Sequence, residues 1–454
     1  MDDVLDEISA WAAGLTWEDL PQEVRARAAH ALTDSVATMV GGASAPATRI
    51  VSGYATTGST GPAAVVGAGR TASPRDAALV NAVAASALDF DDGHYLAGAI
   101  HPGSIIVPAA LATAGPSGPV RDVLVAQVAG YEVGLRAAHL LWPLHDDSHY
   151  HATGTAGAIG AAVAGARALG LDADGVRRAV LIAWVHAPMS TFGLPMIKES
   201  IGWGSMTGVA AAELAAAGFM KTPPGYSIPG NSVIPPSPFH ARQADSDPFV
   251  TSFGTRFETQ HTYFKSFAAC RYTHAAAAGL AQLMATHGIG PDDIVGIDVR
   301  THEAATFLDE RAPQTLETAQ YSFPWVLATV AQLGRAGAAE MAESGLDDPR
   351  RAALAAKVTL VHAPELDQHY PRRYPSTVAV RTARTVVEGT FIDAPGDPEL
   401  QMGDADLRDK WLALMTPSLG AAAPEVVDLL HDPDADIGSA LRAVWSPFLT
   451  GDRA

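Results

Sequence analysis

The sequence contains a single cysteine, Cys270, among 454 residues. One thiol cannot form a disulfide within the chain, and it cannot build the cysteine clusters that hold structural zinc or iron–sulfur centres. Charged residues are also scarce, at 17%, whereas hydrophobic residues make up 48%. This balance is typical of a well-buried globular protein and argues against a disordered chain.

Basic residues are in the minority, because 30 Lys and Arg stand against 49 Asp and Glu, which gives a formal net charge of −19. Nucleic acid requires a basic face, so it is disfavoured as a partner. The most apolar stretch, residues 155–170, is interrupted by Arg167 and is short for a membrane span. The N-terminal segment MDDVLDEISAW lacks the basic and apolar regions of a secretory signal. We therefore expect a cytoplasmic protein that binds neither nucleic acid nor membrane.

Alanine-rich segments with helical spacing dominate the first 220 residues. Alanine is the best helix former, and small residues let helices pack closely, so these segments predict an all-helical assembly. The pattern recurs in residues 25–39, 77–88, 107–114, 120–141, 156–169 and 208–217. Residues 221–262 are instead rich in Pro, Ser and Gly, which is typical of a long irregular connection.

The pattern changes after residue 290. Alternating or β-branched residues predict strands, and they occur in residues 294–301, 357–362 and 377–385. Helical spacing recurs in residues 274–286, 325–333, 404–415 and 425–430. We therefore predict a mostly α fold. A large all-helical domain would comprise residues 1–262 and 397–454, and a smaller α+β domain would comprise residues 263–396.

Two segments of the first half place ionisable residues in apolar surroundings. Residues 87–104, ALDFDDGHYLAGAIHPGS, contain Asp89 and His101, and they are either a surface loop or part of a site. An unpaired carboxylate at Asp89 would be costly to bury, which favours the site. His151 precedes a Gly/Ala-rich helix that Thr153 is placed to cap. The N-terminus of that helix would favour a carboxylate ligand, although a packing helix with an incidental histidine also explains the segment.

Two further segments concentrate cations. Lys198 precedes the Gly/Ser-rich turn of residues 197–219, where a solvated lysine is the ordinary alternative. Residues 263–274, YFKSFAACRYTH, favour a functional site, because so many cations among aromatic and small residues are unusual in a chain with 17% charge. The candidates in this segment are Lys265, Cys270, Arg271 and His274. Gln320 and Tyr321 are weaker candidates, since a helix start explains them equally well.

The sequence lacks the motifs of several common enzyme and cofactor-binding classes. It contains no G-x-S-x-G elbow, no P-loop, no complete G-x-G-x-x-G motif and no H-E-x-x-H motif. His149 and His151 form an i, i+2 pair, which commonly occurs by chance. We therefore expect no metal and no organic cofactor.

Five blocks of the sequence, in this order, resemble the MmgE/PrpD family, which includes 2-methylcitrate dehydratases, cis-aconitate decarboxylases and an iminodisuccinate epimerase. The resemblance runs along nearly the whole chain, in residues 87–112, 150–172, 197–219, 263–276 and 319–325. It implies a large helical domain with a smaller α+β lid domain, and a homodimer.

The resemblance also implies site residues. The positions used for catalysis or binding would be Asp89, His101, His151, Lys198 and Lys265, and those for substrate contacts would be Gly93, His94, Cys270, Arg271, His274, Gln320 and Tyr321. Gly93 departs from a threonine common in the family, and Cys270 stands where decarboxylase relatives place a histidine and many other members a cysteine. The run IHPGSII departs from the G-H-P-S-D-N run of methylcitrate dehydratases, which counts against methylcitrate as the substrate.

These residue types suit removal of a proton next to a carboxylate. Lys198 and Lys265 would stabilise the negative charge, and His101 and His151 would transfer protons, with the roles of the two histidines left open. Asp89 would orient one histidine. We therefore predict a cofactor-independent lyase of the hydro-lyase type that acts on a small carboxylic acid. An isomerase, a decarboxylase and a non-catalytic acid-binding protein remain alternatives.

Overall fold

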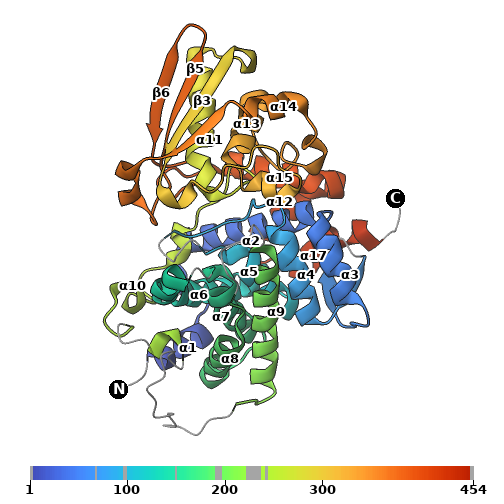
Figure 1. The fold of residues 1–454 in the computed structure, drawn as a ribbon. Helices are drawn as coiled ribbons and strands as arrows, with labels where there is room; N and C mark the ends of the chain where they lie inside the picture. Colours follow the sequence, from blue (N-terminus) through green and yellow to red (C-terminus); the bar gives the residue numbers. More distant parts are fainter. Residues whose placement is uncertain are drawn as a thin grey trace. The chain divides into compact units, whose positions relative to one another are not determined.

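The computed structural model describes residues 4–66, 69–95, 100–148, 151–189, 197–220, 237–240 and 244–449. Side chains are described for these residues except 143–148, 197–199, 240 and 446–449. The chain divides into two compact units (Figure 1). The large unit comprises Met1–Ala87, Asp91–Thr262 and Leu407–Ala454, and the small unit comprises Leu88–Phe90 and Tyr263–Asp406.

The large unit is built from helices, as its alanine content predicts. Its only strands among the described residues are β1 (Ala63–Val65) and β2 (Arg70–Ala72), which pair antiparallel. The helices before the small unit are α1 (Val4–Gly14), α2 (Gln22–Gly42), α3 (Pro46–Thr56), α4 (Pro74–Ser86), α5 (Pro102–Thr113), α6 (Val120–Ser148), α7 (Ala152–Ala168), α8 (Ala173–His186), α9 (Ile197–Ala216) and α10 (Pro248–Thr251). Those at the C-terminal end are α15 (Asp404–Leu419), α16 (Ala423–His431) and α17 (Ile437–Leu449).

Helix α7 lies at the centre of the large unit, where it packs against α5, α6, α8 and α9. Its residues from Ala152 to Ala166 are all buried. Close approach to α6 depends on glycine, because a Cβ added at Gly160 would lie 2.8 Å from the carbonyl oxygen of Gly130. The small residues of this helix therefore bring its N-terminus, and the residues beside it, deep into the unit.

The small unit contains a four-stranded mixed sheet in the order β4-β3-β5-β6. Its strands are β3 (Ile294–Thr301), β4 (Val358–His362), β5 (Ser376–Thr382) and β6 (Val386–Phe391). Strands β3 and β4 are parallel, and the other pairs are antiparallel. The helices of this unit are α11 (His274–His287), α12 (Leu316–Gln320), α13 (Phe323–Leu333) and α14 (Pro349–Ala355). Helix α11 contacts β5 and β6, and α13 contacts β4 (Figure 1).

The mostly α fold with a smaller α+β unit confirms the predicted fold class. The chain was expected to return to the large domain at residue 397, whereas the small unit extends to Asp406. Polar contacts hold the first of these extra residues there: Arg271 pairs with Asp397, and Oδ2 of Asp397 accepts a hydrogen bond from the Ala394 amide at 2.7 Å. The segment Leu88–Phe90 also belongs to the small unit.

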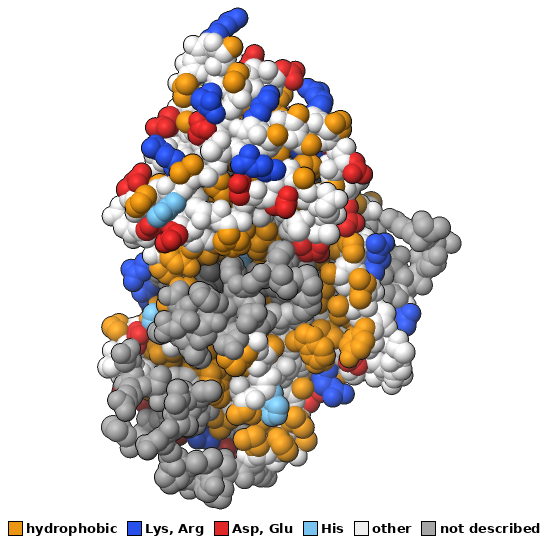
Figure 2. Space-filling model, viewed as in Figure 1, with side chains coloured by type: hydrophobic (Ala, Val, Ile, Leu, Met, Phe, Trp, Pro, Cys, Tyr) orange, Lys and Arg blue, Asp and Glu red, His pale blue; other side chains and the backbone are white. Residues whose placement is uncertain are grey.

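The surface of the small unit carries both signs of charge. Figure 2 shows Lys and Arg side chains interspersed with Asp and Glu side chains there. Exposed ion pairs such as Arg381–Asp298, at 2.7 Å, join the two signs. Exposed ion pairs of this kind contribute little to the free energy of unfolding. Because they place acidic side chains beside basic ones, they divide the basic charge of this surface into small areas. Among the helices in the described part of the chain, none is long and apolar enough to cross a membrane.

Candidate active site

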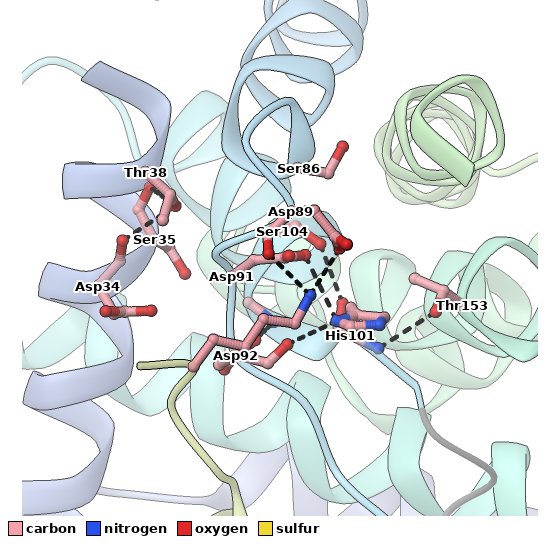
Figure 3. A network of polar contacts seen from close by, with 12 residues as sticks. Asp34, Ser35, Thr38, Ser86, Asp89, Asp91, Asp92, His101, Ser104 and Thr153 are labelled. Atoms are coloured by element: carbon pink, nitrogen blue, oxygen red, sulfur yellow. Dashed lines mark hydrogen bonds and ion pairs between the residues drawn. The ribbon is translucent and has the colours of Figure 1, made fainter. Parts of the chain in front are cut away.

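His101 lies at the start of helix α5, as its N-cap residue, with Pro102 at the first helical position. The proline fixes the backbone angle that a helix needs at this point. The amide of His101 donates to the hydroxyl of Thr153, which lies near the N-terminus of α7, at 3.1 Å (Figure 3). His101 is only 8% exposed. The backbone of His101 is therefore fixed at the N-terminus of α5 and, through the Thr153 hydroxyl, near the N-terminus of α7.

The ring of His101 faces the loop before α5. Its Nδ1 atom lies 2.8 Å from the carbonyl oxygen of Asp92 and 3.5 Å from Oδ2 of Asp91. Both aspartates are buried, so the loop that contains them is part of the interior and not an exposed turn. This result removes the surface-loop interpretation for Asp91 and Asp92, whereas residues 96–99 of the same segment lie outside the described residues.

The Asp92 side chain fixes this loop. Its Oδ1 accepts a hydrogen bond from the Gly103 amide at 2.7 Å, and its Oδ2 accepts one from the Tyr131 hydroxyl at 2.8 Å. A Cβ at Gly103 would lie 2.6 Å from Oδ1, so a larger residue here would force the Asp92 side chain to move. Burial raises the pKa of the Asp92 carboxyl to about 8, and the carboxylates of Asp34 and Asp91 add to the rise against the two hydrogen bonds.

His151 is the N-cap residue of α7, and its Nδ1 accepts a hydrogen bond from the Thr153 amide at 3.2 Å. Thr153 was expected to cap this helix, which is wrong: His151 provides the cap, and the Thr153 hydroxyl is bound to the His101 amide instead. The rings of His101 and His151 are stacked, with centroids 6.2 Å apart and planes inclined by 18°. The large unit thus brings together the two histidines that the sequence singled out.

A second buried acidic group, which the sequence analysis did not identify, lies in the same unit. Asp34 of α2 accepts from Nζ of Lys410 at 2.7 Å and from the Trp411 indole at 2.9 Å. Burial raises the pKa of Asp34 and lowers that of Lys410. Figure 3 shows Asp34 on α2 beside the segment that contains Asp91 and Asp92. No spacing in the sequence could indicate this group, because its members come from opposite ends of the chain.

Lys265 and Asp89 form a buried ion pair within the small unit. Nζ of Lys265 donates to Oδ1 of Asp89 at 2.6 Å and to its carbonyl oxygen at 3.1 Å. Lys265 is 0% exposed and Asp89 is 7% exposed. Asp89 has a φ of 49°, in the left-handed region that aspartate tolerates better than most residues. Lys265 therefore holds the Asp89 carboxylate, and the orientation of a histidine by Asp89 stays a prediction.

The remaining predicted residues of the small unit surround Cys270. Burial, with a smaller contribution from the Asp89 carboxylate, raises the pKa of its thiol to about 12, although the residue keeps some exposed surface. The Cys270 amide donates to the Gln320 carbonyl at 2.9 Å, and Tyr321 follows as the C-cap residue of α12. Arg271 contacts Nδ1 of His274 at 2.6 Å and pairs with Asp397. Substrate contacts by these residues stay a prediction.

Two predicted contacts of the large unit, Gly93 and His94, follow Asp92 and are buried. Nε2 of His94 lies 3.3 Å from Oε2 of Glu258. Burial of Glu258 raises its carboxyl pKa, but His94 and Arg256 more than offset this effect, and the pKa is lowered overall. His94 is thus paired with a carboxylate. Lys198 belongs to the first turn of α9, and its side chain lies outside the described residues.

One group of side chains among the described residues has the spacing of metal ligands, namely Glu303, His362 and Asp367 of the small unit. Nε2 of His362 already lies 2.8 Å from Oδ2 of Asp367, and Glu303 is exposed. Carboxylates grouped in this way are common without an ion. The histidine pair of the large unit belongs to no such group among the residues that the structure describes.

Comparison with known proteins identifies the family of this chain. The MmgE/PrpD N-terminal domain matches residues 6–225, and the MmgE/PrpD C-terminal domain matches residues 267–432. The chain is 28% identical over 305 residues to cis-aconitate decarboxylase from Homo sapiens, an alignment that covers 64% of this chain and 62% of that protein. The alignment thus covers less than two thirds of the human relative's length.

Fungal relatives align over more of the chain. Cis-aconitate decarboxylase from Aspergillus terreus is 25% identical over 400 residues, which cover 80% of this chain and 79% of that protein. Cis-aconitate decarboxylase-like protein oryM from Aspergillus oryzae is 24% identical over 485 residues, which cover 97% of each chain. The two domain matches lie in the expected order and together extend over most of the sequence, and on this ground the chain belongs to the MmgE/PrpD family.

Proposed function

We propose that this chain is a lyase that acts on a small carboxylic acid by removing the proton on the carbon next to a carboxylate. The observation that supports this proposal most is the pair of nearly parallel histidine rings, His101 and His151, joined through Thr153. Histidine is the side chain best suited to proton transfer near neutral pH. Binding an acid requires cations, but it does not require two fixed imidazoles.

The difficult step of this reaction is the build-up of negative charge. When the proton leaves, the electron pair of the C–H bond moves onto the carboxylate, which takes on enediolate character. Hydrogen-bond donors and cations that are fixed beforehand stabilise such charge without reorganising. We assign this role to Lys198 and Lys265. Lys265 is held in place by its two bonds to Asp89, so it has little freedom to reorient.

We favour loss of water over loss of carbon dioxide as the second half of the reaction. The names of the relatives favour decarboxylation, which is the second candidate. Against it, the family resemblance implies a histidine in decarboxylase relatives at the position where this chain has Cys270. Its thiol, with a pKa of about 12, neither accepts nor releases a proton readily at neutral pH. An elimination needs no proton donor at that position.

The test combines a substrate screen with isotope exchange. Wild-type protein is incubated in D₂O with a panel of small di- and tricarboxylic acids, including cis-aconitate, and each acid is followed by NMR. We expect one acid to lose water and to incorporate deuterium next to a carboxylate. General-base catalysis and a fixed donor to the developing charge each contribute roughly 10²-fold or more, so both His101→Ala and His151→Ala should reduce exchange to background. The matched control is His287→Ala, since His287 is exposed at the end of α11.

Three other outcomes would each lead to a different conclusion. Release of carbon dioxide in place of water would establish the second candidate. Tight binding of an acid without exchange or turnover would make the chain a non-catalytic binding protein. Turnover at wild-type rates in both histidine variants would remove the proton-transfer pair from the proposal.

A further inference from the structure

The hydrogen bonds of the two histidines differ in a way that fixes their protons. Nδ1 of His101 lies 2.8 Å from a carbonyl oxygen, that of Asp92, and a carbonyl can only accept. Nδ1 of His101 therefore carries a proton. The carboxylate oxygen of Asp91, 3.5 Å from the same nitrogen, favours the same assignment. In the neutral ring, Nε2 of His101 then bears the lone pair.

His151 is the reverse case. Its Nδ1 receives the Thr153 amide, a group that can only donate, so this nitrogen carries no proton. A neutral ring with a bare Nδ1 must carry its proton on Nε2. Adding a second proton would break the bond that caps α7, at a helix end that already carries partial positive charge. His151 is thus held as a neutral donor.

We propose that His101 alone transfers protons and that His151 stays neutral throughout, donating a hydrogen bond from Nε2 to the oxygen on which negative charge develops. This assignment rests on the function proposed above. Nε2 of His101 takes the proton from carbon, and the C–H electron pair passes to the carboxylate. When the C–O bond breaks, the imidazolium of His101 returns that proton to the departing hydroxyl, and water leaves. His101 carries the proton in both transfers, so the reaction does not require His151 to transfer one.

The same assignment bears on the choice of reaction. An epimerisation that uses two histidines needs one to remove a proton and the other to supply one to the opposite face of the carbon. A histidine locked as a neutral donor cannot serve as the acid, and two stacked rings inclined by only 18° do not point toward each other across a substrate. The geometry therefore favours elimination over a two-histidine epimerisation.

Conservative variants separate the two roles. Gln places an amide N–H near the position of histidine Nε2, but it is no base. His151→Gln should therefore retain turnover within about tenfold of wild type, whereas His101→Gln should lose at least about 100-fold. His151→Asn preserves the cap, since asparagine is a preferred N-cap residue, but it lacks the distant donor. It should melt like wild type and lose about 100-fold or more in kcat, as loss of an oxyanion donor does.

The pH profile gives a second readout. In a plot of kcat/KM against pH, the fall in rate at low pH reports protonation of the essential base. This fall should persist in His151→Gln and should be absent from the residual activity of His101→Gln. His287→Gln is the matched control and should reproduce the wild-type profile. Equal losses in the two Gln variants, or a larger loss at position 151, would overturn the division of roles.

A third readout needs no substrate. In protein labelled with ¹⁵N-histidine, two-bond ¹⁵N–¹H spectra distinguish the two tautomers, and the Gln variants assign the signals. We expect a proton on Nδ1 of His101 and on Nε2 of His151. Either tautomer reversed would overturn this inference while leaving the proposed lyase intact. Absence of turnover with every acid, with both tautomers as expected, would instead remove the proposed function and this assignment with it.

Discussion

Cys270 shows how surroundings decide the chemistry of one residue. A thiol acts as a nucleophile only as its thiolate, and nucleophilic cysteines have a lowered pKa. Here burial raises the pKa of the thiol to about 12, the Asp89 carboxylate adds to the rise, and Lys265 only partly offsets it. At pH 7 Cys270 is therefore a neutral thiol, which packs but does not attack.

Cys270→Ala should accordingly retain turnover within about tenfold of wild type, because a neutral thiol contributes contacts and not covalent chemistry. The reactivity of the wild-type thiol gives an independent check. Since Cys270 is the only cysteine, alkylation by iodoacetamide followed by mass spectrometry reports on it alone. Modification should be slow at pH 7 in the folded protein and fast in denaturant. Loss of activity to background in Cys270→Ala, with rapid alkylation at pH 7, would contradict this prediction.

Residue types in the sequence identified His101, His151 and Lys265, but not what each of them contacts. The motif DFDD drew attention to Asp89 as the partner of a histidine, which stays a prediction, but it did not indicate that the carbonyl of Asp92 and the carboxylate of Asp91 face His101. Three neighbouring aspartates are equivalent in a sequence. They differ only after the backbone turns at Asp89, where φ is 49°, and this turn follows no residue pattern.

Helices α5 and α6 meet through Asp92, which binds the Gly103 amide at the start of α5 and the Tyr131 hydroxyl of α6. Because its pKa of about 8 lies above the ordinary value of 3.8, the folded protein holds a proton at Asp92 that the unfolded chain has released near neutral pH. The contribution of this proton to the free energy of unfolding is fully present below about pH 4. It falls as the pH rises, and it is lost once the pH passes about 8.

Asp92→Asn should remove this dependence, because asparagine keeps one acceptor for Gly103 and offers a donor to Tyr131 without titrating. Wild type should lose stability relative to the variant between pH 5 and 8, by at most about 1.4 kcal/mol per pH unit. Urea unfolding at several pH values measures the difference. Asp292→Asn, at an exposed position, should show a difference that stays constant with pH. A constant difference for Asp92→Asn as well would mean that Asp92 is ionised in the folded state.

Elements were predicted best where one pattern dominates. The alternation in residues 294–301 coincides with β3, and the helical spacing in residues 274–286 coincides with α11 to within one residue. Helices α3 and α8 were missed, because α3 combines β-branched residues with Gly53 and α8 interrupts its apolar face with Arg177 and Arg178. The strand expected over residues 377–385 divides into β5 and the turn before β6, which alternation alone cannot locate.

At the scale of the whole molecule, a net charge of −19 opposes any acidic substrate, so local cations must overcome it. Buried cations are indeed present in both units, among them Lys265 and Arg271 in the small unit and Lys410 and Arg136 in the large one. Each of these four cations is paired with a buried carboxylate, namely Lys265 with Asp89, Arg271 with Asp397, Lys410 with Asp34 and Arg136 with Glu132. A homodimer, which the family resemblance implies, stays a prediction, and apolar residues such as Ile50 and Tyr54 of α3 are exposed in the single chain.

The last prediction concerns metals. The reaction proposed here uses imidazole, ammonium and amide groups of the chain, and each proton removed from carbon returns through His101, so no step calls for a Lewis acid. Protein treated with EDTA and desalted should therefore keep its full rate with a confirmed substrate. The group Glu303, His362 and Asp367 has the spacing to retain a divalent ion, and His362→Ala removes its only nitrogen ligand. That variant should match wild type in kcat before and after chelation. A rate that falls on chelation and returns with Zn²⁺ or Mg²⁺ in wild type, but not in His362→Ala, would place an essential metal at this group. If the metal effect persists in His362→Ala, the ion must be held by other residues, and the proton transfers assigned to His101 would have to be derived again with that ion present.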